Sequence, residues 1–293
     1  MYEPIDEMRS ILQKSLPVEG IQKTGIDGLV IFRRDVPYKK RPQLYHPQII
    51  MLAQGKKNIY LGEQKFVYDA SRYFVQTVPL PVVCEAVIEH EQPMLGLVIA
   101  VDPKIIGEIL YEMEFHTSIP QKVSTGVYDA PVTERMRDSV VRLLRTLADD
   151  DERNILGPLY LKELLFLILT NEKGEILREL AVSNRGVYQI ARVIREIHEH
   201  YDMPLEIPEL AKEAGMSSSG FHTAFKSVTS TSPLQYIKHI RLHKAREIIQ
   251  REGEKANTAA TRVGYESVSQ FSREYKRTFG ISPSQDRQPI SAF

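Results

Sequence analysis

Residues 210–226 read LAKEAGMSSSGFHTAFK, and residues 259–277 read AATRVGYESVSQFSREYKR. In both segments a short alanine-containing stretch precedes a glycine, a serine-rich stretch, and then an aromatic pair with basic residues. A glycine adopts positive φ at low cost, which suits a sharp turn between two helices, and a serine hydroxyl can cap the helix that follows. With Gly215 and Gly264 in equivalent places, the repeated arrangement predicts two helix-turn-helix units.

The second helix of each unit has a predicted core face and a predicted free face. Phe221 with Phe225, and Phe271 with Tyr275, are spaced by four residues and share one side of a helix, which we assign to the core. The opposite side is then available to a partner, and side chains of suitable size for base edges in a major groove lie there. These base-reading candidates are Ser219, His222, Thr223, Val268, Ser269, Ser272 and Arg273.

Capping patterns and charges support the same interpretation. Ser267 with Gln270 forms a capping-box pattern, Ser217 or Ser218 can cap the earlier helix, and Arg273 has the fork geometry that pairs with a guanine. Solvated helix faces are the alternative for a single unit, and the repetition argues against it. Candidates for phosphate contacts are Ser217, Ser218, Lys226, Lys238, Arg241, Lys244, Arg262, Lys276 and Arg277.

Residues 233–251 separate the two units and predict one long helix with Ser232 as its cap and Pro233 in its first turn. From Gly186 onward nearly every window is typical of helix, and six breaks predict seven helices. Gly220, inside the first recognition helix, is expected to weaken that helix in the absence of DNA.

The overall charge of zero conceals a division of sign. Residues 1–184 carry 22 Lys+Arg and 26 Asp+Glu, which is −4, so the remaining 16 basic and 12 acidic residues give +4 after residue 184. Such an asymmetry favours a C-terminal part that meets a polyanion, with ordinary surface variation as the alternative.

The region from 20 to 101 predicts a small β-barrel or sandwich, because short β-rich runs alternate there with turn residues. Residues 55–57 and 62–65 are predicted hairpin turns. The predicted strands lie at 28–32, 48–52, 58–61, 73–78, 82–88 and 95–101.

Helical patterns follow between about 104 and 170. One helix is predicted at 104–113 and another from Val132, in which apolar residues recur at spacings of four, three and four. That seam predicts either packing on the chain's own β-domain or a homodimer contact. A further apolar helix at 159–169 is predicted to be buried in the domain or at the same interface. The four residues of the candidate dimer seam are Met136, Val140, Leu143 and Leu147.

Cysteine content and the N-terminus bear on the compartment. Cys84 is the only cysteine, so no internal disulfide and no four-cysteine zinc site can form, and a reducing compartment is expected. The acidic N-terminus lacks an apolar signal core and no apolar stretch reaches membrane-spanning length, so we expect a cytoplasmic protein without a membrane partner.

The sequence contains no strong motif for catalysis or metal binding. His46, His90 and His116 are isolated, His198 and His200 do not share a helix face, and no phosphate loop or nucleophile elbow occurs. We therefore expect no catalytic residue, no metal site and no cofactor. A small-molecule pocket inside the barrel is a hypothesis, since barrel mouths commonly bind ligands. Its candidate residues are Arg33, Tyr45, Tyr60, Tyr73 and Cys84, with redox sensing by Cys84 as a further option.

Three groups of residues closely resemble the DNA-binding domain of the AraC/XylS family of bacterial transcription regulators. They are 232–236 (SPLQY), 241–246 (RLHKAR) and the run from 263–265 (VGY) to 279–283 (FGISP). Asp286 departs from the pattern, because the family usually has tyrosine there, and Glu206 stands where serine or threonine often caps. Residues 45–47, 54–57, 68–71 and 93–97 resemble more loosely the cupin-like N-terminal domain of one branch of the family.

This resemblance implies an α+β architecture in which a cupin-like regulatory barrel and a dimerising helical segment precede two helix-turn-helix motifs joined by a long helix. The expected domains are 1–184 (barrel about 20–101, helices about 104–170) and 185–293 (motifs about 206–228 and 256–277). It also implies a homodimeric, effector-responsive activator with duplex DNA and RNA polymerase as partners. A cupin-type enzyme fused to DNA-binding helices and a constitutive architectural DNA-binding protein are the alternatives.

Overall fold

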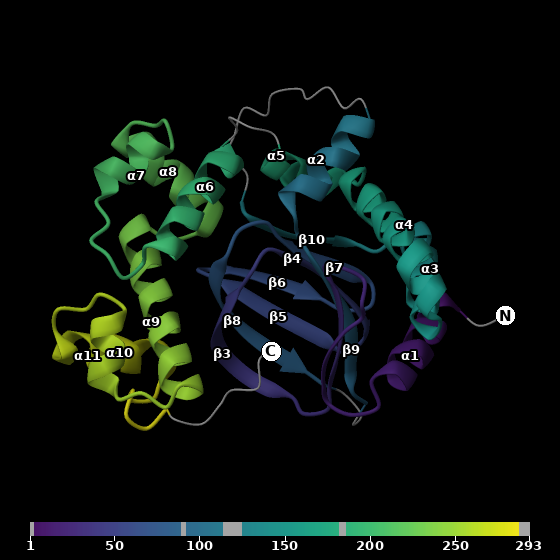
Figure 1. Cartoon of the computed structure of the whole chain (residues 1–293), viewed down its shortest axis with the longest axis horizontal. Helices are drawn as coiled ribbons and strands as arrows, with labels where there is room; N and C mark the ends of the chain where they lie inside the picture. Colours follow the sequence, from purple (N-terminus) through teal and green to yellow (C-terminus); the bar gives the residue numbers. More distant parts are fainter. Residues whose placement is uncertain (1–2, 89–91, 114–124, 182–185, 287–293) are drawn as a thin grey trace.

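The computed structural model describes residues 3–88, 92–113, 125–181 and 186–286. A β-rich region with flanking helices is followed by a region that is entirely helical (Figure 1). This confirms the predicted α+β class. The predicted boundary after residue 184 lies outside the described residues. None of the helices in the described ranges is long and apolar enough to cross a membrane.

The strands form two antiparallel sheets and not one closed barrel. The first sheet has the order β1-β2-β9-β4-β7-β10 and the second has the order β3-β8-β5-β6. The aromatic ring of Tyr68 in the second sheet stacks on Phe74 in the first, with ring centroids 5.3 Å apart, so the two sheets enclose a common core. The strands are β1 (Gly20–Lys23), β2 (Leu29–Arg34), β3 (Tyr38–Tyr45), β4 (Gln48–Gln54), β5 (Lys56–Leu61), β6 (Gln64–Tyr68), β7 (Arg72–Gln76), β8 (Leu80–Val87), β9 (Met94–Ala100) and β10 (Val127–Pro131).

All six predicted strand runs overlap observed strands, whereas β1, β3, β6 and β10 were not predicted. β10 lies among the helices in sequence and pairs with the edge of β7, with Tyr128 opposite Val75. The predicted hairpin turn at 62–65 is confirmed, because Leu61 pairs with Gln64 across a two-residue turn.

The predicted hairpin at 55–57 is wrong. β4 and β5 belong to different sheets, so Gly55 forms a corner between them. Its φ of +87° favours glycine, and a Cβ there would lie 2.9 Å from the Cβ of Met94.

Helices pack around the β-region in the N-terminal part. α1 (Pro4–Ser15), which was not predicted, buries Met8 and Leu12 and contacts β2, β4 and β9. α2 (Pro103–Glu112), α3 (Glu134–Arg145), α4 (Asp150–Leu169) and α5 (Glu175–Ala181) follow, with the short 3-10 turns η1 (Thr146–Ala148) and η2 (Glu172–Gly174) beside α4.

The candidate dimer seam on α3 is part of the core of this chain. Met136, Val140 and Leu143 are at most 1 % exposed, and Leu147 is half-buried against the same core. α3 packs between α1 and α4. Of the two interpretations of the seam, packing within the chain is therefore the one observed, and its assignment as a dimer contact is wrong, because these side chains already have intramolecular neighbours.

The C-terminal region holds six helices among the described residues, against seven predicted. They are α6 (Gly186–Glu199), α7 (Ile207–Glu213), α8 (Ser218–Thr229), α9 (Pro233–Arg251), α10 (Ala256–Arg262) and α11 (Val268–Phe279). The seventh was predicted after Pro283, where residues up to 286 form a turn and residues 287–293 lie outside the described part.

The long helix α9 joins two cores. Tyr236, Ile237 and Ile240 near its start belong to the same hydrophobic cluster as the β-region, α6, α7 and α8. Leu242 and Ile249 belong to a separate cluster with α10 and α11. The first helix-turn-helix is thus continuous with the N-terminal region, whereas the second is attached mainly through α9.

Candidate nucleic-acid interface

α7 and α8 form the first helix-turn-helix, with Gly215 between them at a φ of +67°. Ser217 caps α8, since its Oγ accepts a hydrogen bond from the N–H of Gly220 at 3.2 Å. Phe221 and Phe225 are fully buried, with ring centroids 5.4 Å apart. Gly220 lies in the first turn of α8, which the Ser217 cap stabilises.

α10 and α11 form the second helix-turn-helix. Gly264 has a φ of +78°, and a Cβ at this position would lie 2.4 Å from the carbonyl oxygen of Asp202, so only glycine fits. Ser267 caps α11 by accepting from the N–H of Gln270 at 3.3 Å. The side chain of Gln270 donates to Glu274 at 3.2 Å, so only half of the predicted capping box forms.

Five of the seven base-reading candidates are exposed, as the sequence predicts. Ser219, His222 and Thr223 are exposed on α8, and Ser269 and Arg273 are exposed on α11. Val268 and Ser272 are half-buried, and Val268 packs against the core of the second unit. In both units the buried aromatic pair therefore turns a polar helix face outward.

Figure 1 shows the two units at opposite ends of α9. At a rise of about 1.5 Å per residue, the 19 residues of α9 span about 28 Å. One turn of duplex DNA measures about 34 Å. The separation is therefore suited to two successive major-groove segments on one side of a duplex.

Eight of the nine phosphate candidates divide into two groups. Ser217, Ser218, Lys226, Lys276 and Arg277 are exposed. The other group already has carboxylate partners: Lys238 pairs with Glu274 at 3.0 Å, Lys244 with Glu247 at 3.2 Å, and Arg262 with Glu252 at 2.5 Å.

Arg241 has a structural role in place of the predicted phosphate contact. Its guanidinium donates through Nε to the carbonyl of Tyr201 at 2.6 Å, through Nη1 to Gly264 at 3.0 Å, and through Nη2 to Met203 at 2.9 Å. These bonds connect the end of α6 with the turn of the second unit. Backbone carbonyls thereby engage all three nitrogens of the Arg241 guanidinium.

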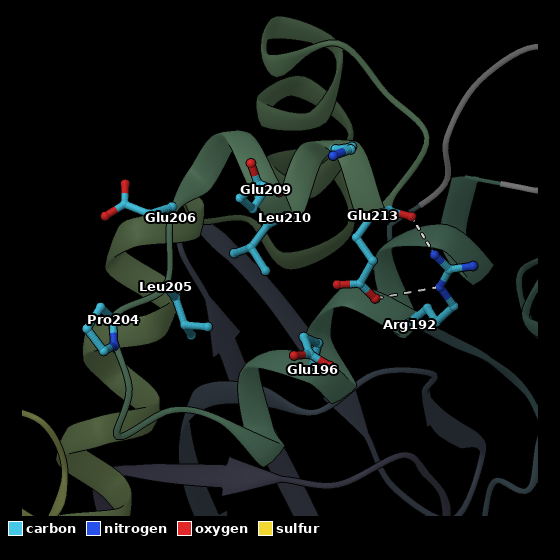
Figure 2. A pocket seen from close by; sticks show the side chains of 9 residues that line it. Arg192, Glu196, Pro204, Leu205, Glu206, Glu209, Leu210 and Glu213 are labelled. Carbon is cyan, nitrogen blue, oxygen red and sulfur yellow. Dashed lines mark hydrogen bonds and ion pairs between the residues drawn. The ribbon is translucent and has the colours of Figure 1, made fainter.

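An acidic groove of about 600 Å³ lies between α6 and α7 (Figure 2). Glu196, Glu206, Glu209 and Glu213 line it, and Arg192 of α6 reaches the side chain of Glu213 at 3.7 Å. Four carboxylates disfavour an approaching phosphate backbone. Arg192 and Lys212 line the same groove, so two basic side chains accompany the four carboxylates.

The adjacent histidines are engaged in different contacts. His198 Nε2 lies 2.9 Å from the hydroxyl of Tyr236, and burial, followed by the charges of His46 and Lys244, lowers the pKa of His198 to about 4. His200 Nδ1 lies 2.8 Å from a carboxylate oxygen of Glu196, four residues earlier in the chain. Glu199 is close to this pair. Carboxylates and one histidine that lie close together at a surface do not by themselves indicate a bound metal. We therefore propose no metal site here.

Only two of the five predicted effector residues point between the sheets. Tyr45 and Cys84 are buried there, on β3 and β8. Arg33 pairs with Asp35 at 2.7 Å near the rim, and the hydroxyl of Tyr60 donates to Glu85 at 3.1 Å on the outer face. Tyr73 is buried against Tyr128, on the side of β7 opposite Phe74.

Other polar residues between the sheets were not recognised from the sequence. They are Arg34, Tyr38, Arg41, Lys57 and Tyr68. Residues 38–41 are strongly charged and resemble a surface loop in sequence, and only their pairing with β8 shows which side chains point inward.

Asp286 was noted in the sequence only as a departure from a pattern. In the structure it is buried and accepts hydrogen bonds from Arg246 at 2.7 Å, Gln250 at 2.8 Å and the Tyr275 hydroxyl at 3.0 Å. It thus anchors the end of the second unit to α9.

Two recognition helices with outward polar faces, carried at the ends of one rigid helix, define a double helix-turn-helix DNA-binding protein. Comparison with models of known protein families supports this class of protein. Residues 25–176, just over half of the chain, match the model of the AraC-type transcriptional regulator N-terminus, and residues 210–289 match a helix-turn-helix domain. The chain therefore belongs to the AraC-type transcriptional regulators.

Several curated proteins are similar to parts of this chain. The probable thc operon regulatory protein of Rhodococcus erythropolis is 32 % identical over 108 residues, which is 36 % of this chain and 32 % of that protein. ExsA of Pseudomonas aeruginosa is 28 % identical over 150 residues, covering 50 % of this chain and 53 % of ExsA. The chain thus matches about a third to a half of the length of these relatives.

The fold of the whole chain is similar to that of ToxT from Vibrio cholerae. One crystal structure of ToxT superposes with a TM-score of 0.57 at 12 % identity, covering 91 % of this chain and 97 % of ToxT. Another, with a bound unsaturated fatty acid, has a TM-score of 0.56 at 11 % identity, covering 90 % of this chain and 96 % of ToxT. At this identity the likeness establishes the fold.

Proposed function

We propose that this chain is a sequence-specific DNA-binding transcription regulator whose two recognition helices read two successive segments of the major groove. The observation that carries the proposal is the pair of exposed faces, Ser219, His222 and Thr223 on α8 and Ser269 with Arg273 on α11. Their small hydroxyls and one guanidinium suit base edges. The exposed Ser217, Ser218, Lys226, Lys276 and Arg277 supply phosphate contacts at the flanks.

Selection of bound sequences from random duplex DNA by the full chain tests this function. We expect a bipartite motif whose two parts are separated by about one helical turn. In the Arg273→Ala variant, we expect the base preference to be lost at one position, in only one of the two parts of the motif. Binding without any enriched motif, which merely weakens with salt, would instead support the architectural alternative.

We propose a homodimer formed through α4. Ile155, Leu159 and Phe166 recur along one side of this helix and are 67 %, 58 % and 37 % exposed. An antiparallel pairing with a second copy, centred between Ile155 and Leu159, brings the acidic first turn of each α4 toward Lys162 of the other copy, which pairs with Glu112 at 2.7 Å in its own chain. An isologous contact of this kind closes as a two-fold dimer.

The remaining predictions follow from this function. We propose a small-molecule effector, supported by the fatty acid that one ToxT structure of the same fold contains. RNA polymerase is the partner that activation requires, and the cytoplasm is the compartment in which bacterial DNA is bound. We also propose that the chain is not an enzyme, because the polar residues described between its sheets are tyrosines, arginines, one lysine and the single Cys84, and a catalytic metal needs three or four convergent ligands.

A further inference from the structure

Gln270 is the third residue of α11 and lies on the exposed side of the second unit. The capping-box pattern assigns its side chain to the end of the helix, but the side-chain amide instead donates to Glu274, one turn further along, at 3.2 Å. Side chains three residues apart are neighbours on a helix surface, so Gln270 lies beside Arg273. An exposed amide therefore accompanies the guanidinium that we assign to a base edge.

Glu274 is held in place by two further hydrogen bonds. The hydroxyl of Tyr265, in the turn before α11, donates to its Oε2 at 2.7 Å, and Nζ of Lys238 on α9 donates to its Oε1 at 3.0 Å. Burial raises the pKa of Glu274, but these hydrogen bonds, with that from Gln270 and the charge of Lys238, lower it below its ordinary value. Glu274 is therefore an ionised carboxylate at neutral pH.

An ionised carboxylate only accepts hydrogen bonds, and this fixes the orientation of the Gln270 amide. Its nitrogen must face Glu274, because the amide oxygen would be repelled there. One N–H is then engaged, whereas the amide oxygen and the second N–H have no hydrogen-bond partner in the part of the chain that the structure describes. A free acceptor next to a free donor matches the major-groove edge of adenine, which offers the N6 donor and the N7 acceptor.

We propose that Gln270 is a further base-reading residue, which Glu274 positions to recognise an adenine close to the base read by Arg273. The amide oxygen accepts from N6 of the adenine and the free N–H donates to N7, the bidentate contact that glutamine makes in a major groove. Glu274 itself touches no base, because its two oxygens already accept three hydrogen bonds. This inference deepens the proposed DNA-binding function and rests on it.

The first unit has no counterpart to this contact. Gly220 lies three residues after the capping Ser217, as Gln270 lies three residues after the capping Ser267. A glycine has no side chain that could reach a base edge. We therefore expect the added adenine preference only in the part of the motif that α11 reads, so that this preference distinguishes the two parts.

Selection of bound sequences from random duplex DNA by the full chain tests the inference. We expect an adenine to be enriched within about two base pairs of the position that Arg273→Ala relaxes. In Gln270→Ala, the ratio of the affinities for duplexes with and without this adenine should fall at least about fivefold, while the other positions keep their preferences. Gln13→Ala, on the exposed side of α1, is the control and should leave the motif unchanged.

Two further comparisons separate base recognition from stability. Glu274→Gln replaces the carboxylate with a group that also donates, so it no longer dictates which end of the Gln270 amide faces it. We expect the adenine preference to weaken at this one position, whereas a purely structural role would weaken binding to all duplexes alike. A duplex with 7-deazaadenine at this position, which lacks the N7 acceptor, should bind more weakly than the adenine duplex to the wild type but equally to Gln270→Ala.

An adenine preference that persists in Gln270→Ala would overturn the proposal, as would an equal loss of binding to all duplexes in that variant. An unchanged motif in Glu274→Gln would refute the positioning role of Glu274. If Glu274→Gln does not fold, as judged by circular dichroism, Tyr265→Phe removes one of the bonds that hold Glu274 and provides the same comparison. A motif without this adenine refutes the present inference alone, whereas the absence of any enriched motif refutes the proposed function.

Discussion

The hydroxyl of Tyr236 on α9 donates a hydrogen bond of 2.7 Å to the carbonyl oxygen of Pro79, at the start of β8. The same hydroxyl lies 2.9 Å from Nε2 of His198 on α6, which can donate to it as the neutral imidazole that a pKa of about 4 maintains. Nearby, the N–H of Gly126 donates to the carbonyl of Val228 on α8 at 3.0 Å. One buried tyrosine thus connects the β-region with two helices of the DNA-binding region.

Tyr236→Phe removes that connection without changing the shape of the side chain. The Pro79 carbonyl and the His198 ring each lose a buried partner, which costs about 1–3 kcal/mol. We expect a lower Tm in thermal unfolding of the full chain. Tyr111→Phe is the control, because Tyr111 is 87 % exposed, and an equal loss in both variants would contradict the assigned role of Tyr236.

Arg273 and Lys226 are expected to act differently on DNA. Arg273→Ala should lose about 1–3 kcal/mol of discrimination at one base position, whereas Lys226→Ala should weaken all sequences alike and reduce the salt slope by about one. Titrations of specific and mismatched duplexes at several salt concentrations measure both effects. A uniform loss for Arg273→Ala would show that it contacts only phosphate.

Arg241→Lys distinguishes a structural arginine from a phosphate contact, since it preserves the charge. A lysine cannot donate to three separate carbonyls in the geometry of the guanidinium, so we expect the free energy of unfolding to fall by about 2–3 kcal/mol. Chemical denaturation measures the change. Unchanged stability together with weakened DNA binding would indicate that Arg241 contacts a phosphate, as the sequence predicts.

Leu159→Glu should convert the dimer into a monomer, because it places two carboxylates at the centre of the proposed α4 contact. Analytical ultracentrifugation measures the change in mass. Val140→Ala, in the buried α3 seam, should instead lower stability by about 2 kcal/mol and leave the assembly unchanged. A dimer that persists in Leu159→Glu would place the interface elsewhere.

Lys57 makes the stability of the ligand-free chain depend on pH. Burial, the largest cause, and the nearby Arg34 and Arg41 lower its pKa from 10.5 to about 8, with Cys84 acting in the opposite direction. Between these two values the unfolded chain holds a proton that the folded chain has released. Stability therefore rises with pH in this window, by up to about 1.4 kcal/mol per pH unit.

Comparison with Lys57→Met isolates this effect, since the two proteins share all other titrating groups, including Tyr38, Tyr45 and Tyr68. We expect the wild type to gain stability relative to the variant between pH 8 and 9.5 in urea unfolding, a range within the predicted window. A constant difference would show that Lys57 has an ordinary pKa.

Local patterns predicted the helix-turn-helix units correctly, down to the capping serines Ser217 and Ser267 and the turn glycines Gly215 and Gly264. These features depend on residues within a few positions of each other in the chain. β10 and α1 were missed for the opposite reason, because β10 pairs with a strand far earlier in the chain and α1 is stabilised by packing on three strands.

The order of residues was sufficient to show which helix faces of the two units are buried, because an aromatic pair spaced by four can reach only one side of a helix. It did not reveal which basic residues are free. Arg241 and Lys226 look equivalent in sequence, yet one is held by three carbonyls from distant turns and the other is exposed. Likewise, alternation gives every strand two faces, and only the pairing of β3 with β8 and of β5 with β6 brought Arg41, Lys57 and the tyrosines to the same interior.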